Sequence, residues 1–171
     1  TLFHHPNETI HREAFEGVNV VQLDNETPTG WPMKSAALLR TPYIKSLFLD
    51  ADFYPTSSLM KHFAASSGAL CANGLYECIQ WEKYGLTSDG RPPLDGGFFM
   101  IDKFRHPQLV AVYYYLNTLQ HQKTYEWGCG DQDQLRAALR GLGIVYDSIG
   151  QGNPIGKAVV YDGVGVHRRS E

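Results

Sequence analysis

The feature that most constrains this chain is an apolar run that ends in two aspartates and then a proline. Lys45–Leu49 has the composition of a buried strand, and Asp50 and Asp52 follow it directly. Pro55 lacks an N–H group and resists continuation of a strand, so we expect the chain to turn there. The aspartates then lie at the carboxyl end of a core strand, where open α/β sheets bind ligands. Two hard oxygen ligands suit Mg²⁺ or Mn²⁺, whereas the alternative is a solvated acidic turn.

A second segment, Asp95-Gly96-Gly97, leads into an apolar run over 98–101 that is followed by Asp102. Glycines at such a position permit unusual backbone angles and close approach of a ligand. The alternative is a simple tight turn before a buried strand.

A third segment is Asp131-Gln132-Asp133, which follows two glycines and opens an Ala/Leu-rich helix over Gln132–Arg140. Asp131 is a good residue for the N-cap of this helix. Capping explains one aspartate of this triplet and not the whole triplet.

These three segments, in this order, resemble the DxD-containing, nucleotide-sugar-dependent glycosyltransferases of the GT-A fold. The Asp-Gln-Asp triplet resembles the retaining, glycogenin-like class and also the corresponding segment of fungal α-mannosyltransferases. The resemblance covers residues 18–167 and implies a Rossmann-like α/β fold with a mixed, mainly parallel sheet flanked by helices. It also implies a single domain over 1–171 whose base-binding portion is missing or altered, because Asp50 lies too near the start.

The resemblance implies a metal-dependent transfer of a sugar to a hydroxyl acceptor, with retention of configuration. It places Mn²⁺ or Mg²⁺ on Asp50, Asp52 and a histidine near the C-terminus, His167. A solvated His167 is the alternative. The cation would neutralise the diphosphate leaving group.

The remaining site residues are also carried by the resemblance. Asp131 and Gln132 would position the donor sugar beside the reacting carbon, and Asp95 would touch the donor or the acceptor. The residues expected on the cofactor side are Lys34, Asp50, Ala51, Gly96 and Gly97. For Lys34 an ordinary solvated lysine is the alternative.

The implied partners are a UDP- or GDP-sugar donor and a glycan or glycoprotein acceptor. The implied compartment is the Golgi lumen for a eukaryotic secretory enzyme, and otherwise the cytoplasm. Two other functions stay open: a degenerate, non-catalytic module that binds carbohydrate or protein, and a metal-dependent phosphohydrolase.

Size and composition set outer limits on these alternatives. A chain of 171 residues is long enough for one domain with a real core. The net charge is −3 and the basic residues are scattered, which does not indicate a nucleic-acid surface. No apolar stretch is long enough for a transmembrane helix, and residues 1–6 lack the apolar region of a signal peptide.

Further elements follow from periodicity and turn residues. The expected helices are Glu8–Phe15, Pro32–Arg40, Ser57–Ala65 and Pro107–Thr118. The expected strands are Val18–Leu23, Gly68–Cys71, Ile144–Tyr146 and Ala158–Tyr161, with a loop over Gly150–Gly156. A further group of apolar and aromatic residues either lines a sugar site or belongs to the core: Tyr76, Ile79, Trp81 and Tyr84. The sequence does not decide the redox state of Cys71, Cys78 and Cys129.

Overall fold

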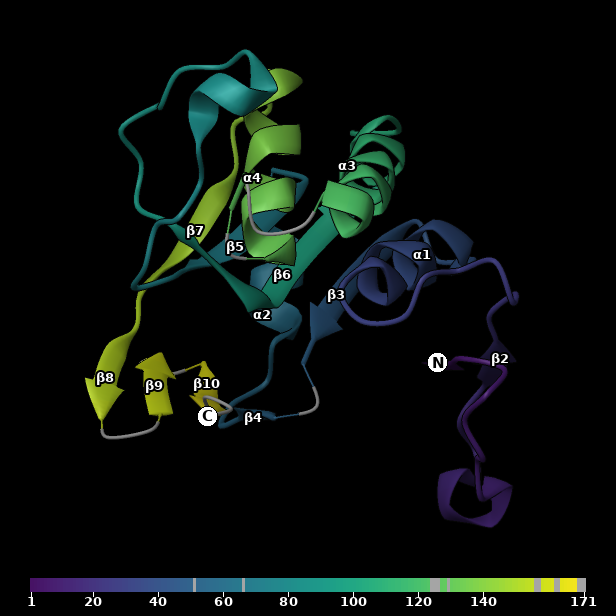
Figure 1. The fold of residues 1–171 in the computed structure, drawn as a ribbon. Helices are drawn as coiled ribbons and strands as arrows, with labels where there is room; N and C mark the ends of the chain where they lie inside the picture. The colour runs from purple at the N-terminus through teal and green to yellow at the C-terminus, as the bar shows by residue number, and fades with distance from the viewer. Residues whose placement is uncertain are drawn as a thin grey trace.

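The computed structural model describes residues 1–50, 52–65, 67–123, 127–128, 130–155, 158–161 and 164–168. Strands and helices alternate along the chain, and the strands form two four-stranded sheets and a separate two-stranded pair (Figure 1). The mixed α/β class expected from the sequence is therefore confirmed. Among the described residues, no helix is both long and apolar enough to cross a membrane.

The central sheet has the strand order β3-β6-β5-β7. These strands are β3 (Lys45–Leu49), β6 (Leu94–Asp102), β5 (Ala69–Asn73) and β7 (Asp147–Gln151). β6 pairs antiparallel with both β3 and β5, and β5 pairs parallel with β7.

The expectation of a mainly parallel sheet is therefore wrong. Parallel neighbours need a long crossover connection, usually an α-helix. The fully described segment 74–93, between β5 and β6, instead contains a short 3-10 helix, η2 (Trp81–Tyr84). The chain consequently returns into the sheet in the opposite direction.

Strand β6 is buried on both faces because it lies between two hydrophobic layers. Phe99 and Ile101 face a core that includes helical residues, whereas Phe98 and Met100 face the other four-stranded sheet, which has shorter strands (the smaller sheet). This alternation is the period of two expected of a strand. It explains why the apolar run in β6 is continuous rather than interrupted by polar residues.

Three helices cover one face of the central sheet: α1 (Pro32–Arg40), α3 (Leu109–Lys123) and α4 (Asp131–Gly141) (Figure 1). The α1 prediction is confirmed, with Pro32 in the first turn, where its missing N–H costs nothing. Helix α4 extends the predicted range by one residue at each end. Helix α3 begins two residues later than predicted and ends at Lys123. The short α2 (Met60–Ala65) begins later than the predicted helix.

The smaller sheet is antiparallel throughout and has the order β4-β10-β9-β8. Its strands are β4 (Phe53–Pro55), β10 (Gly165–Arg168), β9 (Ala158–Tyr161) and β8 (Asn153–Ile155). The predicted strand over β9 is confirmed. Phe53 and Tyr161 pack with Phe98, so the smaller sheet lies against the central one.

Two predictions between α4 and β9 are wrong. Ile144–Tyr146 is not a strand, because the pairing with β5 begins only at Asp147. The predicted loop over Gly150–Gly156 contains the end of β7 and all of β8. Both strands lie at an outer edge of their sheets, where polar and turn-forming residues are tolerated. Because of these residues, the sequence pattern did not indicate a strand.

The N-terminal segment forms a parallel pair, β1 (Leu2–His4) with β2 (Val20–Gln22). Figure 1 shows β2 beyond β3, away from the central sheet. The predicted helix before β2 is reduced to a 3-10 turn, η1 (Arg12–Phe15). A largely apolar cavity of about 570 Å³ is lined by residues of β1, α1 and β3.

The cysteines differ in state. Cys71 is a free thiol in the core, and burial raises its pKa. Cys78 is disulfide-bonded. Cys129 lies outside the described residues.

Candidate functional site

The acidic pair lies where the chain passes from the central sheet to the smaller one. The Asp50 N–H donates to the Gly97 carbonyl at 3.0 Å, and the Phe53 N–H donates to the Asp50 carbonyl at 2.9 Å. The Asp52 carbonyl accepts the Arg168 N–H at 3.1 Å. Both aspartates are thus held by backbone contacts to neighbouring strands. Ala51, predicted on the cofactor side, lies outside the described residues.

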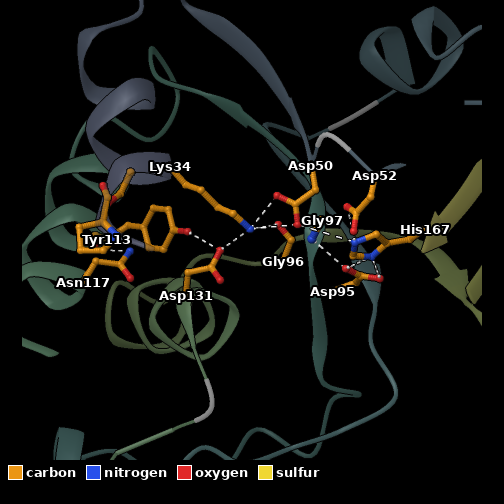
Figure 2. Close-up of polar contacts among 12 residues, drawn as sticks. Lys34, Asp50, Asp52, Asp95, Gly96, Gly97, Tyr113, Asn117, Asp131 and His167 are labelled. Carbon is orange, nitrogen blue, oxygen red and sulfur yellow. Dashed lines mark hydrogen bonds and ion pairs between the residues drawn. The ribbon is translucent and has the colours of Figure 1, made fainter. Parts of the chain in front are cut away.

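His167 on β10 faces this pair, and its side chain is 16% exposed. Its Nε2 lies 3.2 Å from Asp52 Oδ1 and 3.7 Å from Asp50 Oδ2 (Figure 2). One ligand atom from each of the three residues lies within 4.8 Å of the other two. The structure therefore brings the three predicted metal ligands together, from β10 and the turn that follows β3.

Asp95 on β6 lies behind His167, on the side away from the acidic pair. Its carboxylate accepts the Gly97 N–H at 2.8 Å and the hydroxyl hydrogen of Tyr161. His167 Nδ1 lies 3.0 Å from Asp95 Oδ1 and 3.1 Å from Oδ2.

These contacts set the charge states of Asp95 and His167. Burial tends to raise the Asp95 pKa, but the hydrogen bonds from His167 and Tyr161 outweigh it, and the pKa is lowered. The hydrogen bond to Asp95 raises the His167 pKa, although burial acts against it. The two groups therefore stabilise each other as a pair.

Gly96 and Gly97 lie inside β6, where the pairing with β5 shifts register opposite Cys71 and Ala72. Such irregularities are common beside functional sites. Neither glycine has a positive φ, so the expected unusual backbone angle is absent at both. The two glycines instead leave room for neighbouring side chains. A Cβ on Gly97 would lie 2.4 Å from His167 Cε1, and a Cβ on Gly96 would lie 3.2 Å from an Asp131 carboxylate oxygen.

Lys34 joins the two acidic parts of the site. Its Nζ lies 2.8 Å from Asp50 Oδ1 and 3.0 Å from Asp131 Oδ2, and it donates to the Gly96 carbonyl at 3.4 Å (Figure 2). Burial opposes the lysine charge, but Asp131 and Asp50 outweigh it and raise the Lys34 pKa. Burial raises the Asp50 pKa, and Lys34 acts against this rise. Lys34 is therefore not the isolated solvated lysine considered as an alternative.

Helix α4 begins at the site with Asp131 as its first residue. The N-cap position is Gly130, with φ of 142°, so the expectation that Asp131 caps the helix is wrong. The Asp131 carboxylate instead pairs with Lys34 and accepts the Tyr113 hydroxyl at 3.4 Å. Negative charge at a helix N-terminus is also favoured by the helix dipole.

A cavity of about 360 Å³ joins these groups. Its polar lining contains seven of the predicted site residues: Lys34, Asp50, Asp52, Asp95, Asp131, Gln132 and His167. Gly96 and Gly97 lie directly behind two of them, Asp131 and His167.

The group that includes three aromatic residues divides between core and cavity. Ile79 and Trp81 are buried against Ala137 of α4, and Tyr84 packs beside them. Tyr76 is 64% exposed and lines the cavity. Of this group, Tyr76 alone lines the cavity.

Sequence reasoning missed several residues of the site. Tyr161 contacts Asp95, Tyr113 contacts Asp131, and Trp31 and Arg168 line the cavity. For Tyr161 a signal was present, because period-two alternation along β9 places it on the same buried face as Val159. For Tyr113 the helical pattern indicated burial but not its polar partner.

The comparisons with known proteins give a fold and no family. No family model and no curated protein matches the sequence. Among solved structures, the chain is similar to the galactosyltransferase LgtC in complex with donor and acceptor sugar analogs, with a TM-score of 0.51 and 15% identity. The match covers 79% of this chain and 52% of that one. The chain thus has a fold similar to that of a galactosyltransferase and spans about half its length.

Proposed function

We propose that this chain is the metal-binding and donor-binding part of a retaining, nucleotide-sugar-dependent glycosyltransferase. The observation that carries the proposal is the convergence of Asp50, Asp52 and His167 in one cavity with Lys34 and Asp131. The fold similarity to LgtC supports the same reading.

The residues present fit a divalent cation such as Mn²⁺ or Mg²⁺. The two carboxylates suit Mn²⁺ or Mg²⁺, and Asp95 beside Nδ1 leaves His167 Nε2 directed at the carboxylates as a third ligand. When bound, the cation would supply charge neutralisation for a diphosphate leaving group.

The other residues take roles that follow from their positions. The Lys34 ammonium, held between Asp50 and Asp131, provides positive charge for a donor phosphate at the same edge. Gln132 follows Asp131 at the start of α4 and lines the cavity, where it can contact the donor sugar. Tyr76 at the rim offers an aromatic face to a sugar ring.

The acceptor is then a hydroxyl group of a glycan or a glycoprotein, and the donor is a UDP- or GDP-sugar. Hydroxyl attack on the anomeric carbon breaks the bond to the diphosphate, and the departing phosphate oxygen takes the hydroxyl proton. No side chain is needed as a base in this step.

The test is calorimetric titration with UDP and GDP in the presence and absence of Mn²⁺, followed by a transfer assay with UDP- and GDP-sugars. We expect nucleotide binding that requires Mn²⁺ and is lost in Asp52→Asn. A bound nucleotide at a hundredfold excess over its Kd stabilises the fold by about 2.7 kcal/mol, which a thermal-shift assay detects. An equal affinity for nucleotide with and without Mn²⁺ would contradict the proposal.

The same assays separate the other two functions. A degenerate, non-catalytic module shows no metal-dependent nucleotide binding. A phosphohydrolase cleaves the nucleotide-sugar at a rate that an acceptor does not change.

A further inference from the structure

The contacts around His167 point to a role for Asp95 that differs from contact with a substrate. The Asp95 side chain is 10% exposed, and its two oxygens are engaged by the Gly97 N–H, the Tyr161 hydroxyl and His167 Nδ1. Among the described residues, the hydrogen bond and the ion pair of Nδ1 are both with Asp95. Asp95 is therefore placed to act on His167 rather than on a bound ligand.

Two neighbours fix the Asp95 carboxylate in this orientation. The Gly97 N–H lies 2.8 Å from Oδ1, and the Tyr161 hydroxyl donates to Oδ2 from β9, in the other sheet. A carboxylate accepts hydrogen bonds and donates none when ionised. With both oxygens held, the hydrogen between Asp95 and His167 must come from Nδ1.

A hydrogen on Nδ1 leaves the other ring nitrogen with its lone pair. In neutral imidazole one nitrogen is a donor and the other is an acceptor. His167 Nε2 is the nitrogen that lies 3.2 Å from Asp52 and 3.7 Å from Asp50. The Nδ1–H tautomer is thus the form that presents a ligand atom to the acidic pair.

We propose that Asp95, held by Tyr161 and Gly97, is a positioning residue that fixes His167 in the Nδ1–H tautomer with Nε2 directed at Asp50 and Asp52. The benefit of this tautomer for metal binding rests on the proposed metal-dependent function. The tautomer itself can be measured without metal, nucleotide or turnover.

Gly97 also takes part through its missing side chain. The imidazole lies over Gly97 so closely that a Cβ there would be 2.8 Å from both Nδ1 and Nε2. A methyl group at this position would push the ring away from Asp95, from the acidic pair, or from both. Asp95 sets the tautomer, and Gly97 makes room for the ring.

The deciding substitution is Asp95→Asn, which keeps the size of the side chain. The Asn oxygen must face the Gly97 N–H, because a nitrogen there would set two donors against each other. The amide nitrogen then takes the place of Oδ2, which lies 3.1 Å from His167 Nδ1, while the oxygen stays in the place of Oδ1, 3.0 Å from Nδ1. Nδ1 thus loses one of its two acceptors and faces a donor in its place, which shifts the equilibrium toward the Nε2–H tautomer, the form that cannot bind a metal through Nε2.

The experiment is ¹⁵N–¹H correlation NMR of the histidine rings in the metal-free protein, recorded at increasing pH until the His167 ring shifts no longer change and the imidazole is neutral. We expect His167 as the Nδ1–H tautomer in the unmodified protein and a shift toward Nε2–H in Asp95→Asn. Asp24→Asn is the matched control, since Asp24 pairs with Arg40 and does not line the site cavity. It should leave the His167 signals unchanged.

Mn²⁺ titration of the same proteins gives the second measurement. Loss of such a partner typically weakens metal binding by about 10- to 100-fold, so we expect a fall in this range for Asp95→Asn and none for Asp24→Asn. The effect of Tyr161→Phe should be in the same direction and smaller, because the Gly97 and His167 contacts to Asp95 remain.

The outcomes are distinguishable. An Nε2–H tautomer of His167 in the unmodified protein overturns the positioning role, even when every variant fails to fold. An unchanged tautomer in folded Asp95→Asn also overturns it. The expected tautomer together with no Mn²⁺ binding in the unmodified protein leaves the positioning role standing and contradicts the proposed metal-dependent function.

Discussion

Lys34 on α1 and Asp131 at the start of α4 form an ion pair of 3.0 Å across the floor of the site. The same ammonium lies 2.8 Å from Asp50. The Lys34 ammonium thus pairs with two carboxylates, and one of them, Asp50, is a proposed metal ligand. Lys34 should therefore weaken the binding of a cation and strengthen the binding of a phosphate group.

We predict that Lys34→Met raises the affinity for Mn²⁺ and lowers the affinity for UDP or GDP. Removing the ammonium frees Asp50 for the cation and takes away positive charge from the diphosphate. The loss of this ion pair by the buried Asp131 and the partly buried Asp50 should also cost roughly 1–3 kcal/mol of unfolding free energy. Calorimetry and urea unfolding measure these effects. Lys45→Met is the control, since Lys45 pairs with Asp102 outside the site. Equal effects of the two substitutions on Mn²⁺ and nucleotide affinity would show that Lys34 is not part of the donor site.

Asp52→Asn should abolish transfer and reduce the Mn²⁺ affinity while leaving the fold intact. The side chain is 41% exposed, so the loss of its ion pair with His167 should change the unfolding free energy by no more than about 1 kcal/mol. Turnover in Mn²⁺ and thermal unfolding are the measurements. Wild-type turnover in this variant would show that the metal site is misplaced.

Gln132→Ala should lower kcat more than it raises KM. Gln132 lines the cavity, and we expect it to act on charge that develops only in the transition state. Steady-state kinetics with the preferred donor separate the two parameters. A raised KM with unchanged kcat would indicate a binding contact alone.

Gly96→Ala should displace the start of α4. Its Cβ would lie 3.2 Å from the Asp131 carboxylate and 3.3 Å from Gln132 Cβ, so these groups must shift by a few tenths of an ångström. We expect donor turnover to fall at least tenfold, because catalytic geometry is sensitive to small displacements. Gly141→Ala is the control: its Cβ would meet only Leu86 at 3.8 Å, and Ala in a helix should stabilise the protein by up to about 1 kcal/mol.

In the metal-free protein, the Asp95–His167 pair should make the unfolding free energy depend on pH. The His167 pKa is raised above 6.5 and the Asp95 pKa is lowered below 3.8, so the pair contributes its full stability between these two values. This stability is lost as pH rises through the folded-state pKa of His167, and also as pH falls through that of Asp95. His167→Gln should remove this component of the unfolding free energy between neutral and alkaline pH. The Mn²⁺ affinity should change in the opposite sense, falling as pH drops, because only neutral imidazole coordinates. Identical pH profiles for the two proteins would contradict the pair.

Local sequence signals predicted the elements that carry the site more reliably than their arrangement. Helix Pro32–Arg40 and strand Lys45–Leu49 have the predicted bounds, because proline placement and an apolar run act within the segment. The direction of β6 relative to β5 depends on the connection over 74–93, which gave only a weak signal. The hydrogen bond between Tyr161 and Asp95 joins strands of different sheets, and no local pattern contains it.

His167 extends into the site from β10, whose neighbours are β4 and β9 of the smaller sheet rather than the buried β6. The imidazole can therefore leave the acidic pair when β10 separates from β4, while the central sheet stays intact. Amide hydrogens of β10 and β4 should exchange by such a partial opening, at a lower free energy than those of β6. A cation held by both sides would couple the two sheets, and bound Mn²⁺ should slow exchange mainly in β10 and β4.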